Sequence, residues 1–240
     1  MTMETTVPIE PKPIDAPVAR PPRSPQDKAQ AAEIIAFGQT LSAVLQAVST
    51  PGPVADALNE GGFREAEIQA GQALQVEASS ALADHLAALG AKLTATRVYL
   101  AAEKAYTSAY TNLRGLVRSA YLKDSGALTA LGVSGTQPRD MENLIRVGDT
   151  LLENAVLPDY VVRLGKRGVT AAKLQNFQTK LAALKAADMA QEEAKGASLR
   201  ATARREQAAA ALKAWMIEFK AFAKVQFKDQ PDILKSWGIK

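Results

Sequence analysis

Hydrophobic residues recur along most of this chain every three or four positions, the spacing that places them on one face of an α-helix. In the N-terminal half, leucines follow a heptad seam: Leu82, Leu86, Leu89, Leu93 and Leu100. In the C-terminal half, a similar seam has two parts: Leu174, Phe177, Leu181 and Leu184, then Trp215, Phe219 and Phe222. No segment shows the period-two alternation of a half-buried strand. The pattern therefore predicts an all-α protein.

The chain also resembles itself at a shift of 106 residues. Residues 58–133 align with 164–239 without a gap, with 16 identities in 76 positions, and Gly62 matches Gly168. Self-similarity at a fixed period indicates repeated structural units. We predict two helical repeats, 25–135 and 136–240, packed as one bundle. Each contains a first helix, a short connector, a long helical stretch and a one-turn helix ending at glycine.

The long stretch of each repeat contains no proline, for example from Phe63 to Leu122. This predicts one continuous helix per repeat, and the two would run antiparallel as the axis of an elongated bundle. Glycine is a frequent helix C-cap, and Gly90 and Gly196 stand at equivalent positions. A compact six-helix bundle, split at Gly90 and Gly196, is the alternative.

The first helix of each repeat has a predicted start. Ser24 is placed to cap a helix that begins at Pro25, and Thr136 to cap one that Pro138 enters. The apolar stretch from Ile34 to Val48 is shorter than the roughly 20 residues of a membrane-spanning helix. We expect it to form a core helix.

The segment before the first helix is rich in proline. Residues 1–24 are predicted to form an extended arm, and its candidate contact residues are Pro8, Pro11, Pro13, Pro17, Pro21 and Pro22. Three interpretations of this segment remain open: it is a solvated linker, an arm that docks on a neighbouring subunit, or a ligand for a groove-type domain. The first six residues lack the basic and apolar regions of a leader peptide, so the expected location is the cytoplasm, with leaderless export left open.

Candidate chemistry is sparse. The chain has no cysteine, and its one histidine, His85, aligns with Gln191 in the second repeat. Leu82 stands where a di-metal helical bundle would need a glutamate, three residues before the histidine. Nucleophile and phosphate-loop motifs are also missing. We expect His85 to lie on the surface and the protein to hold no metal or cofactor and not to be an enzyme.

The segment 212–228 mixes aromatic and basic residues: Lys213, Trp215, Phe219, Lys220, Phe222, Lys224, Phe227 and Lys228. Such a helix would suit an anionic membrane surface. The favoured interpretation is that the aromatic rings fill the core, because the first repeat carries a similar stripe with fewer positive charges. Nucleic-acid binding is not expected, since the total charge of +4 is modest.

Charge differs between the halves, at −2 for residues 26–137 and +6 for 138–240. With the duplication, the seams and the arm, this favours a structural protein that self-associates into rings or filaments. A peripheral membrane-binding or pore-forming protein is the alternative. The ending from Phe227 to Ile239 resembles that of uncharacterised bacterial helical-bundle proteins, a resemblance that implies no function.

Overall fold

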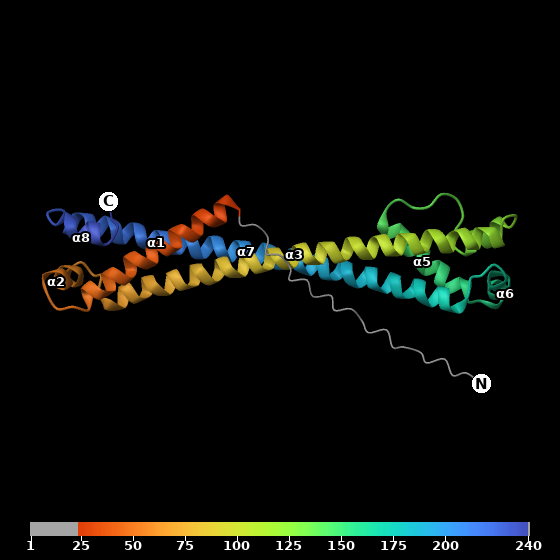
Figure 1. The fold of residues 1–240 in the computed structure, drawn as a ribbon, viewed down its shortest axis with the longest axis horizontal. Coiled ribbons are helices and arrows are strands. Elements are labelled where there is room, and N and C mark those ends of the chain that lie inside the picture. Colours follow the sequence, from red (N-terminus) through yellow and green to blue (C-terminus); the bar gives the residue numbers. More distant parts are fainter. Residues whose placement is uncertain (1–23, 240) are drawn as a thin grey trace, which may run out of the picture.

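The computed structural model describes residues 24–239, which form eight α-helices and, within this range, no strand. The helices are α1 (Pro25–Val48), α2 (Pro53–Glu60), α3 (Glu65–Ala120), α4 (Ser125–Ala130), α5 (Met141–Ala155), α6 (Pro158–Lys166), α7 (Ala171–Gln226) and α8 (Pro231–Ser236). Figure 1 shows an elongated molecule in which α3 and α7 run through the whole length and cross at the centre. The protein is therefore an elongated all-α bundle.

The duplication is visible in the helix boundaries. α3 and α7 each have 56 residues, and both ends of α7 follow those of α3 by 106 positions. The same shift relates α4 to α8, and the left-handed Gly62 to Gly168 (φ 85° and 77°). At a rise of about 1.5 Å per residue, each long helix spans about 84 Å. The predicted continuous helices are confirmed, and the split at Gly90 and Gly196 is wrong.

Two equivalent contacts fix the register of the long pair. His85 on α3 meets Thr202 on α7 at 3.2 Å, and Gln191 on α7 donates to Thr96 on α3 at 3.4 Å. The midpoints between these positions fall beside Gly90 and Gly196. The two glycines thus mark the centre of the crossing, which we call the waist, and α3 and α7 are related there by a pseudo-twofold axis.

Each half of the molecule has its own core, and each core draws on both repeats. In the half that contains α1, the start of α3 packs with the end of α7, and Leu41, Ile68 and Phe219 are fully buried. In the half that contains α5, the end of α3 packs with the start of α7 around Tyr106 and Phe177. We call these the α1 half and the α5 half.

The two first helices differ more than the sequence predicted. α5 begins at Met141, where the Asp140 side chain accepts a hydrogen bond from the Asn143 backbone. The predicted start at Thr136 and Pro138 is wrong, because that segment is a loop whose Gly135 carbonyl accepts hydrogen bonds from two arginines of α3. α5 therefore has 15 residues, whereas α1 has 24, and α5 begins farther from the waist than α1 does.

Two further expectations need correction. The connectors contain the short helices α2 and α6, which the sequence analysis did not separate. In the leucine seam Leu82 is buried, but Leu93 and Leu100 are 46% and 56% exposed. The seam ends at the waist because the α3 face that meets α7 changes there, as the contact of Thr96 with Gln191 shows.

α1 is the one helix of the described part that is long and apolar enough to cross a membrane by length and composition. The predicted start at Pro25 is confirmed, with a capping box of Ser24 and Asp27, and the whole helix is therefore longer than the apolar stretch 34–48. Its buried side chains Ile34, Leu41 and Val44 belong to the core of the α1 half. In this fold α1 is a core helix.

Candidate functional site

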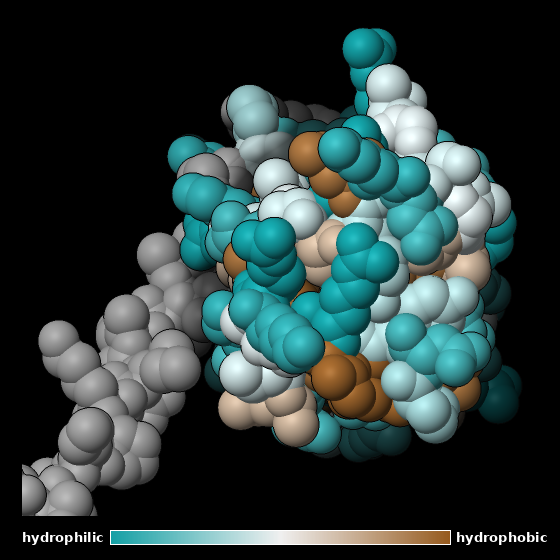
Figure 2. All heavy atoms as spheres, turned by 90° about the vertical axis from the view of Figure 1, so that its right-hand side faces the viewer, coloured by the Kyte–Doolittle hydropathy of each residue, from teal (hydrophilic) through white to brown (hydrophobic). Residues whose placement is uncertain are grey.

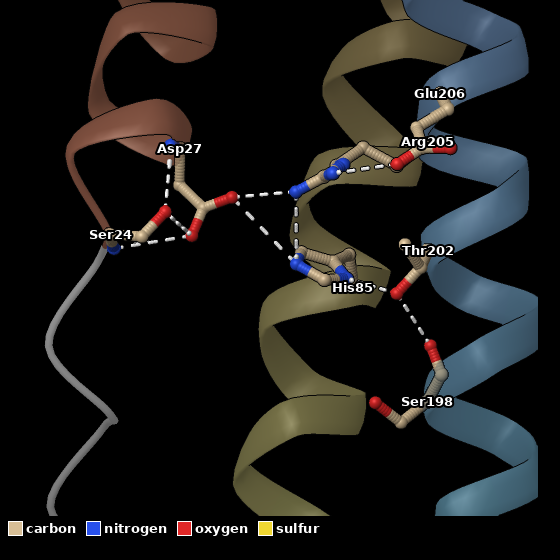
Figure 3. A network of polar contacts seen from close by, with 7 residues as sticks. All are labelled: Ser24, Asp27, His85, Ser198, Thr202, Arg205 and Glu206. Carbon is tan, nitrogen blue, oxygen red and sulfur yellow. Dashed lines mark hydrogen bonds and ion pairs between the residues drawn. The ribbon is translucent and has the colours of Figure 1, made fainter.

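A buried polar network joins the start of α1 to α3 and α7 near the waist (Figure 3). The Ser24 hydroxyl caps α1 by accepting from the Asp27 backbone N–H at 3.1 Å, and it donates to the Asp27 carboxylate at 2.7 Å. This reciprocal cap turns Asp27 toward the two long helices. Asp27, His85 and Arg205, one from each of three helices, are only 3–6% exposed.

Arg205 connects the other two residues. Its Nη1 atom lies 2.7 Å from the Asp27 carboxylate and 3.1 Å from Nε2 of His85. Because a guanidinium can only donate, Nε2 must accept, and the imidazole proton resides on Nδ1. Nδ1 then donates to the Thr202 hydroxyl at 3.2 Å, which in turn donates to the Ser198 carbonyl at 2.8 Å. The contacts thus select one tautomer of a neutral histidine.

The environment shifts two pKa values. Burial alone would raise the pKa of Asp27, but hydrogen bonds from Ser24 and the charge of Arg205, joined by that of His85 when the imidazole is protonated, outweigh it and hold the pKa below 3.8. Burial, and then the charge of Arg205, lower the pKa of His85 below 6.5, against the opposing effect of Asp27 and Glu206. At neutral pH the network therefore holds an ionised Asp27, a neutral His85 and a charged Arg205.

The network acts as a latch on the start of α1. Asp27 is the α1 residue that the Arg205 guanidinium holds, so releasing α1 would leave that charge with only the exposed Glu206 carboxylate, 3.3 Å from Nη2. A neutral, buried histidine whose two nitrogens are both hydrogen-bonded has no free position for a substrate. Among residues 24–239, no group of three or more His, Asp and Glu could hold a metal ion.

The expectation that His85 lies on the surface was wrong. Its partners Asp27 and Arg205 lie 58 positions before it and 120 after it in the chain, and the local helical pattern does not connect them. One signal was available: Ser24 and Asp27 have the spacing of a capping box, which fixes Asp27 at the first turn of an apolar helix.

The basic aromatic segment 212–228 divides between core and surface. Phe219 and Phe227 are buried, and the partly buried Trp215 and Phe222 pack with Phe63 at ring distances of 6.0 and 4.8 Å. The lysines line the outer side: Lys213, Lys224 and Lys228 are exposed, and Lys220 lies over the Phe37 ring at 4.8 Å. The rings and the lysines therefore do not form one surface.

Figure 2 views the end of the α5 half directly, and this mostly hydrophilic surface carries several separate hydrophobic patches. We define the end knob as five exposed residues: Leu122, Val156, Leu157, Val161 and Val162. Val156 and Leu157 join α5 to α6, and Leu122 follows Tyr121, whose ring packs edge-on against Tyr160 at 5.9 Å. All five residues lie at the end of the α5 half, after α3 or on and before α6.

The opposite end carries a hollow instead. We define the end pocket as a cavity of about 300 Å³ between the α1–α2 turn and α8, lined mostly by apolar groups of Ala47, Pro51, Pro53, Val54, Ile233 and Trp237. By the 106-residue repeat, Leu122 and Val162 of the knob correspond to Lys228 and Asp56 at this end. The two ends of the molecule thus present different surfaces.

The candidate arm residues Pro8, Pro11, Pro13, Pro17, Pro21 and Pro22 lie outside the described residues. None of the protein-family models, curated proteins or solved structures with which the chain was compared matches it. The functional argument therefore rests on the geometry of this chain alone.

Proposed function

We propose that this protein is a structural subunit that self-associates head to tail, with the end knob of one copy seated in the end pocket of the next. The single observation that carries the proposal is the presence of an exposed apolar knob at one end and an apolar pocket at the other. A contact between two different surfaces continues into a ring or an open filament. The proposal assigns the protein a role in assembly and none in catalysis.

Exposed apolar surface of this kind supports the proposal because soluble proteins seldom leave it without a partner. The knob places two consecutive pairs, Val156 with Leu157 and Val161 with Val162, at the end of the α5 half, and Val162 and Leu122 are 66% and 77% exposed. At the pocket end, the large apolar residues from 49 to 64 and from 227 to 239 are less exposed than these, and Val225 on the last turn of α7 is the exposed one, at 74%. The asymmetry favours a contact between unlike ends.

Charge favours the same arrangement. The α1 half, residues 24–90 and 197–239, contains 10 Lys and Arg against 12 Asp and Glu, whereas the α5 half, residues 91–196, contains 15 against 10. Opposite signs attract unlike ends and oppose the pairing of two knobs. Since exposed charges are screened beyond about 8–10 Å in physiological salt, apolar contact would hold the junction and charge would orient it.

Sedimentation velocity over a range of concentrations tests the proposal. The wild type should form a concentration-dependent series of oligomers, and Val162→Glu in the knob should shift the protein to monomer. Val76→Glu is the matched control, since Val76 is 64% exposed on α3 away from both ends. A monomeric wild type, or equal association of both variants, would refute the end contact.

A second candidate is peripheral membrane binding or pore formation, and one observation favours it: the length and apolarity of α1. Membrane entry by α1 would need the Asp27–Arg205 latch to open and Leu41 to leave the core. Co-sedimentation with anionic vesicles at low and high salt tests this candidate. Binding that survives high salt and rises in Asp27→Asn would support it, and the absence of binding by both forms would reject it.

A further inference from the structure

The helices α2 and α6 are equivalent in the repeat but carry opposite charge. Residues 53–62 contain two acidic residues and no basic one, whereas the equivalent residues 159–168 contain one acidic residue and three basic ones. The net charges of the two segments are therefore −2 and +2. We call Asp56 and Glu60 the acidic pair. The basic residues are Arg163, Lys166 and Arg167.

The basic residues of α6 are not equivalent to one another. The Arg163 guanidinium lies 4.3 Å from the centre of the Tyr121 ring of its own molecule. We call the other two, Lys166 and Arg167, the basic pair. Both the acidic and the basic pair are exposed, and neither belongs to a salt bridge among residues 24–239. Figure 1 places α2 and α6 at opposite ends of the molecule, so the two pairs cannot meet within one copy.

The stability of α2 does not explain its acidic pair. Asp56 lies in the first turn, where a carboxylate suits the helix dipole, but Glu60 is the last residue of the helix. Carbonyl groups already concentrate negative charge at that end, and the last turn of α2 contains no basic residue. The two carboxylates are also four residues apart on a helix, a spacing at which like charges repel. A cation from outside the molecule would relieve both effects.

Both pairs lie beside the surfaces that the proposed end contact brings together. Val54 of the end pocket is on α2, and the acidic pair follows it by two and six residues. Val162 of the end knob is on α6, and the basic pair follows it by four and five residues. At roughly 1.5 Å per residue, each charge therefore lies within about 9 Å of the apolar contact along its own helix. The long side chains of lysine and arginine are suited to such a rim position.

We propose that the basic pair of one copy forms ion pairs with the acidic pair of the next copy, at the rim of the end contact. The inference rests on the head-to-tail association proposed above and adds the residues that determine which ends meet. Contact between two knobs would bring basic pairs together, and contact between two pockets would bring acidic pairs together. Like charge opposes both of these symmetric contacts. The two pairs thus select unlike ends as partners.

Charge reversal in the full chain, followed by sedimentation velocity, tests the inference. One variant carries Lys166→Glu with Arg167→Glu, and a second carries Asp56→Lys with Glu60→Lys. Each variant alone presents like charges at every junction, so its association should be at least about tenfold weaker than that of the wild type. An equimolar mixture should recover wild-type association, because its junctions again pair opposite charges. Recovery would also show that both variants fold.

A matched control separates the local effect of the basic pair from that of overall charge. Arg97→Glu with Lys104→Glu changes the net charge of the α5 half by the same amount, at exposed positions of α3 between the waist and the end. This control should associate like the wild type.

The outcomes distinguish the inference from the proposal on which it rests. Reversals that leave association unchanged, a mixture as weak as its components, or a control that is weakened equally would overturn the inference. The end contact is measured separately by the wild type and Val162→Glu. A monomeric wild type would refute head-to-tail association and this inference with it. A wild type that Val162→Glu disperses and the charge reversals do not would refute the inference alone.

Discussion

Arg205 donates a hydrogen bond to Nε2 of His85 across 3.1 Å, inside a site from which water is almost excluded. Protonation of His85 would place a second donor at Nε2, facing the guanidinium. The latch is therefore built for the neutral imidazole.

This arrangement predicts a pH dependence of stability. Because burial and Arg205 lower the pKa of His85 in the folded state, the unfolded chain takes up this proton first as the pH falls below 6.5. The free energy of unfolding should decrease from pH 7.5 to pH 5. His85→Gln, which copies Gln191, should flatten that decrease in urea titrations. Equal pH dependence of the two proteins would contradict this account of the latch.

Removal of the Asp27 side chain should lower the free energy of unfolding strongly. Asp27→Ala leaves the buried Arg205 with only the exposed Glu206 carboxylate at 3.3 Å and removes the Asp27 side of the capping box, so we expect a loss of about 3 kcal/mol in the free energy of unfolding. Asp149→Ala is the control, since Asp149 forms a 2.9 Å ion pair with Lys185 that is 40–47% exposed. Its cost should stay below about 1 kcal/mol. Similar losses in both variants would mean that the latch adds nothing beyond a surface pair.

Two glycines of α3 should respond in opposite ways to alanine. A Cβ on Gly71 would lie 2.7 Å from the Trp215 ring, whereas a Cβ on Gly115 would meet no atom within 4 Å. Gly71→Ala should destabilise the fold by about 1–3 kcal/mol through overpacking. Gly115→Ala should stabilise it by up to about 1 kcal/mol through helix propensity. Thermal unfolding of both variants measures the contrast, and the same sign for both would contradict the packing described for the α1 half.

The waist offers a separate test of helix continuity. A Cβ on Gly196 would meet only the flexible Arg200 side chain, at 3.3 Å. In an unbroken α7, Gly196→Ala should raise stability by about 0.5–1 kcal/mol. If Gly196 instead ended a helix, alanine would lower stability, and small-angle scattering of the monomer would report a compact particle.

The periodicity and the 106-residue repeat were sufficient to predict the long helices, because these depend on local spacing and on the absence of proline. The length of α5 was not predictable in the same way. Pro138 is an acceptable helix start by itself, and only the contacts of Gly135 with α3 show that this segment is a loop.

The latch depends on residues far apart in the sequence, and so does a groove of about 800 Å³ between α3 and α7 in the α5 half. His85 finds Arg205 only because the register of α3 and α7 places them together. This groove has Ala109 where the α1 half has Trp215, and Phe177 where the α1 half has Gly71, an exchange that becomes visible once the pseudo-twofold axis superposes the halves. An alignment of the two repeats is enough to detect that exchange of side-chain volume. It does not predict that the exchange leaves an open groove.

Head-to-tail assembly is tested most directly by mixing two variants that each lack one end. Val162→Glu disables the knob, and Ser236→Arg obstructs the pocket from an exposed position of α8. Alone, each variant should sediment as a monomer, because every junction needs both surfaces. An equimolar mixture should form a dimer through its one intact junction and grow no further. Monomers in the mixture, or oligomers in either variant alone, would contradict the account.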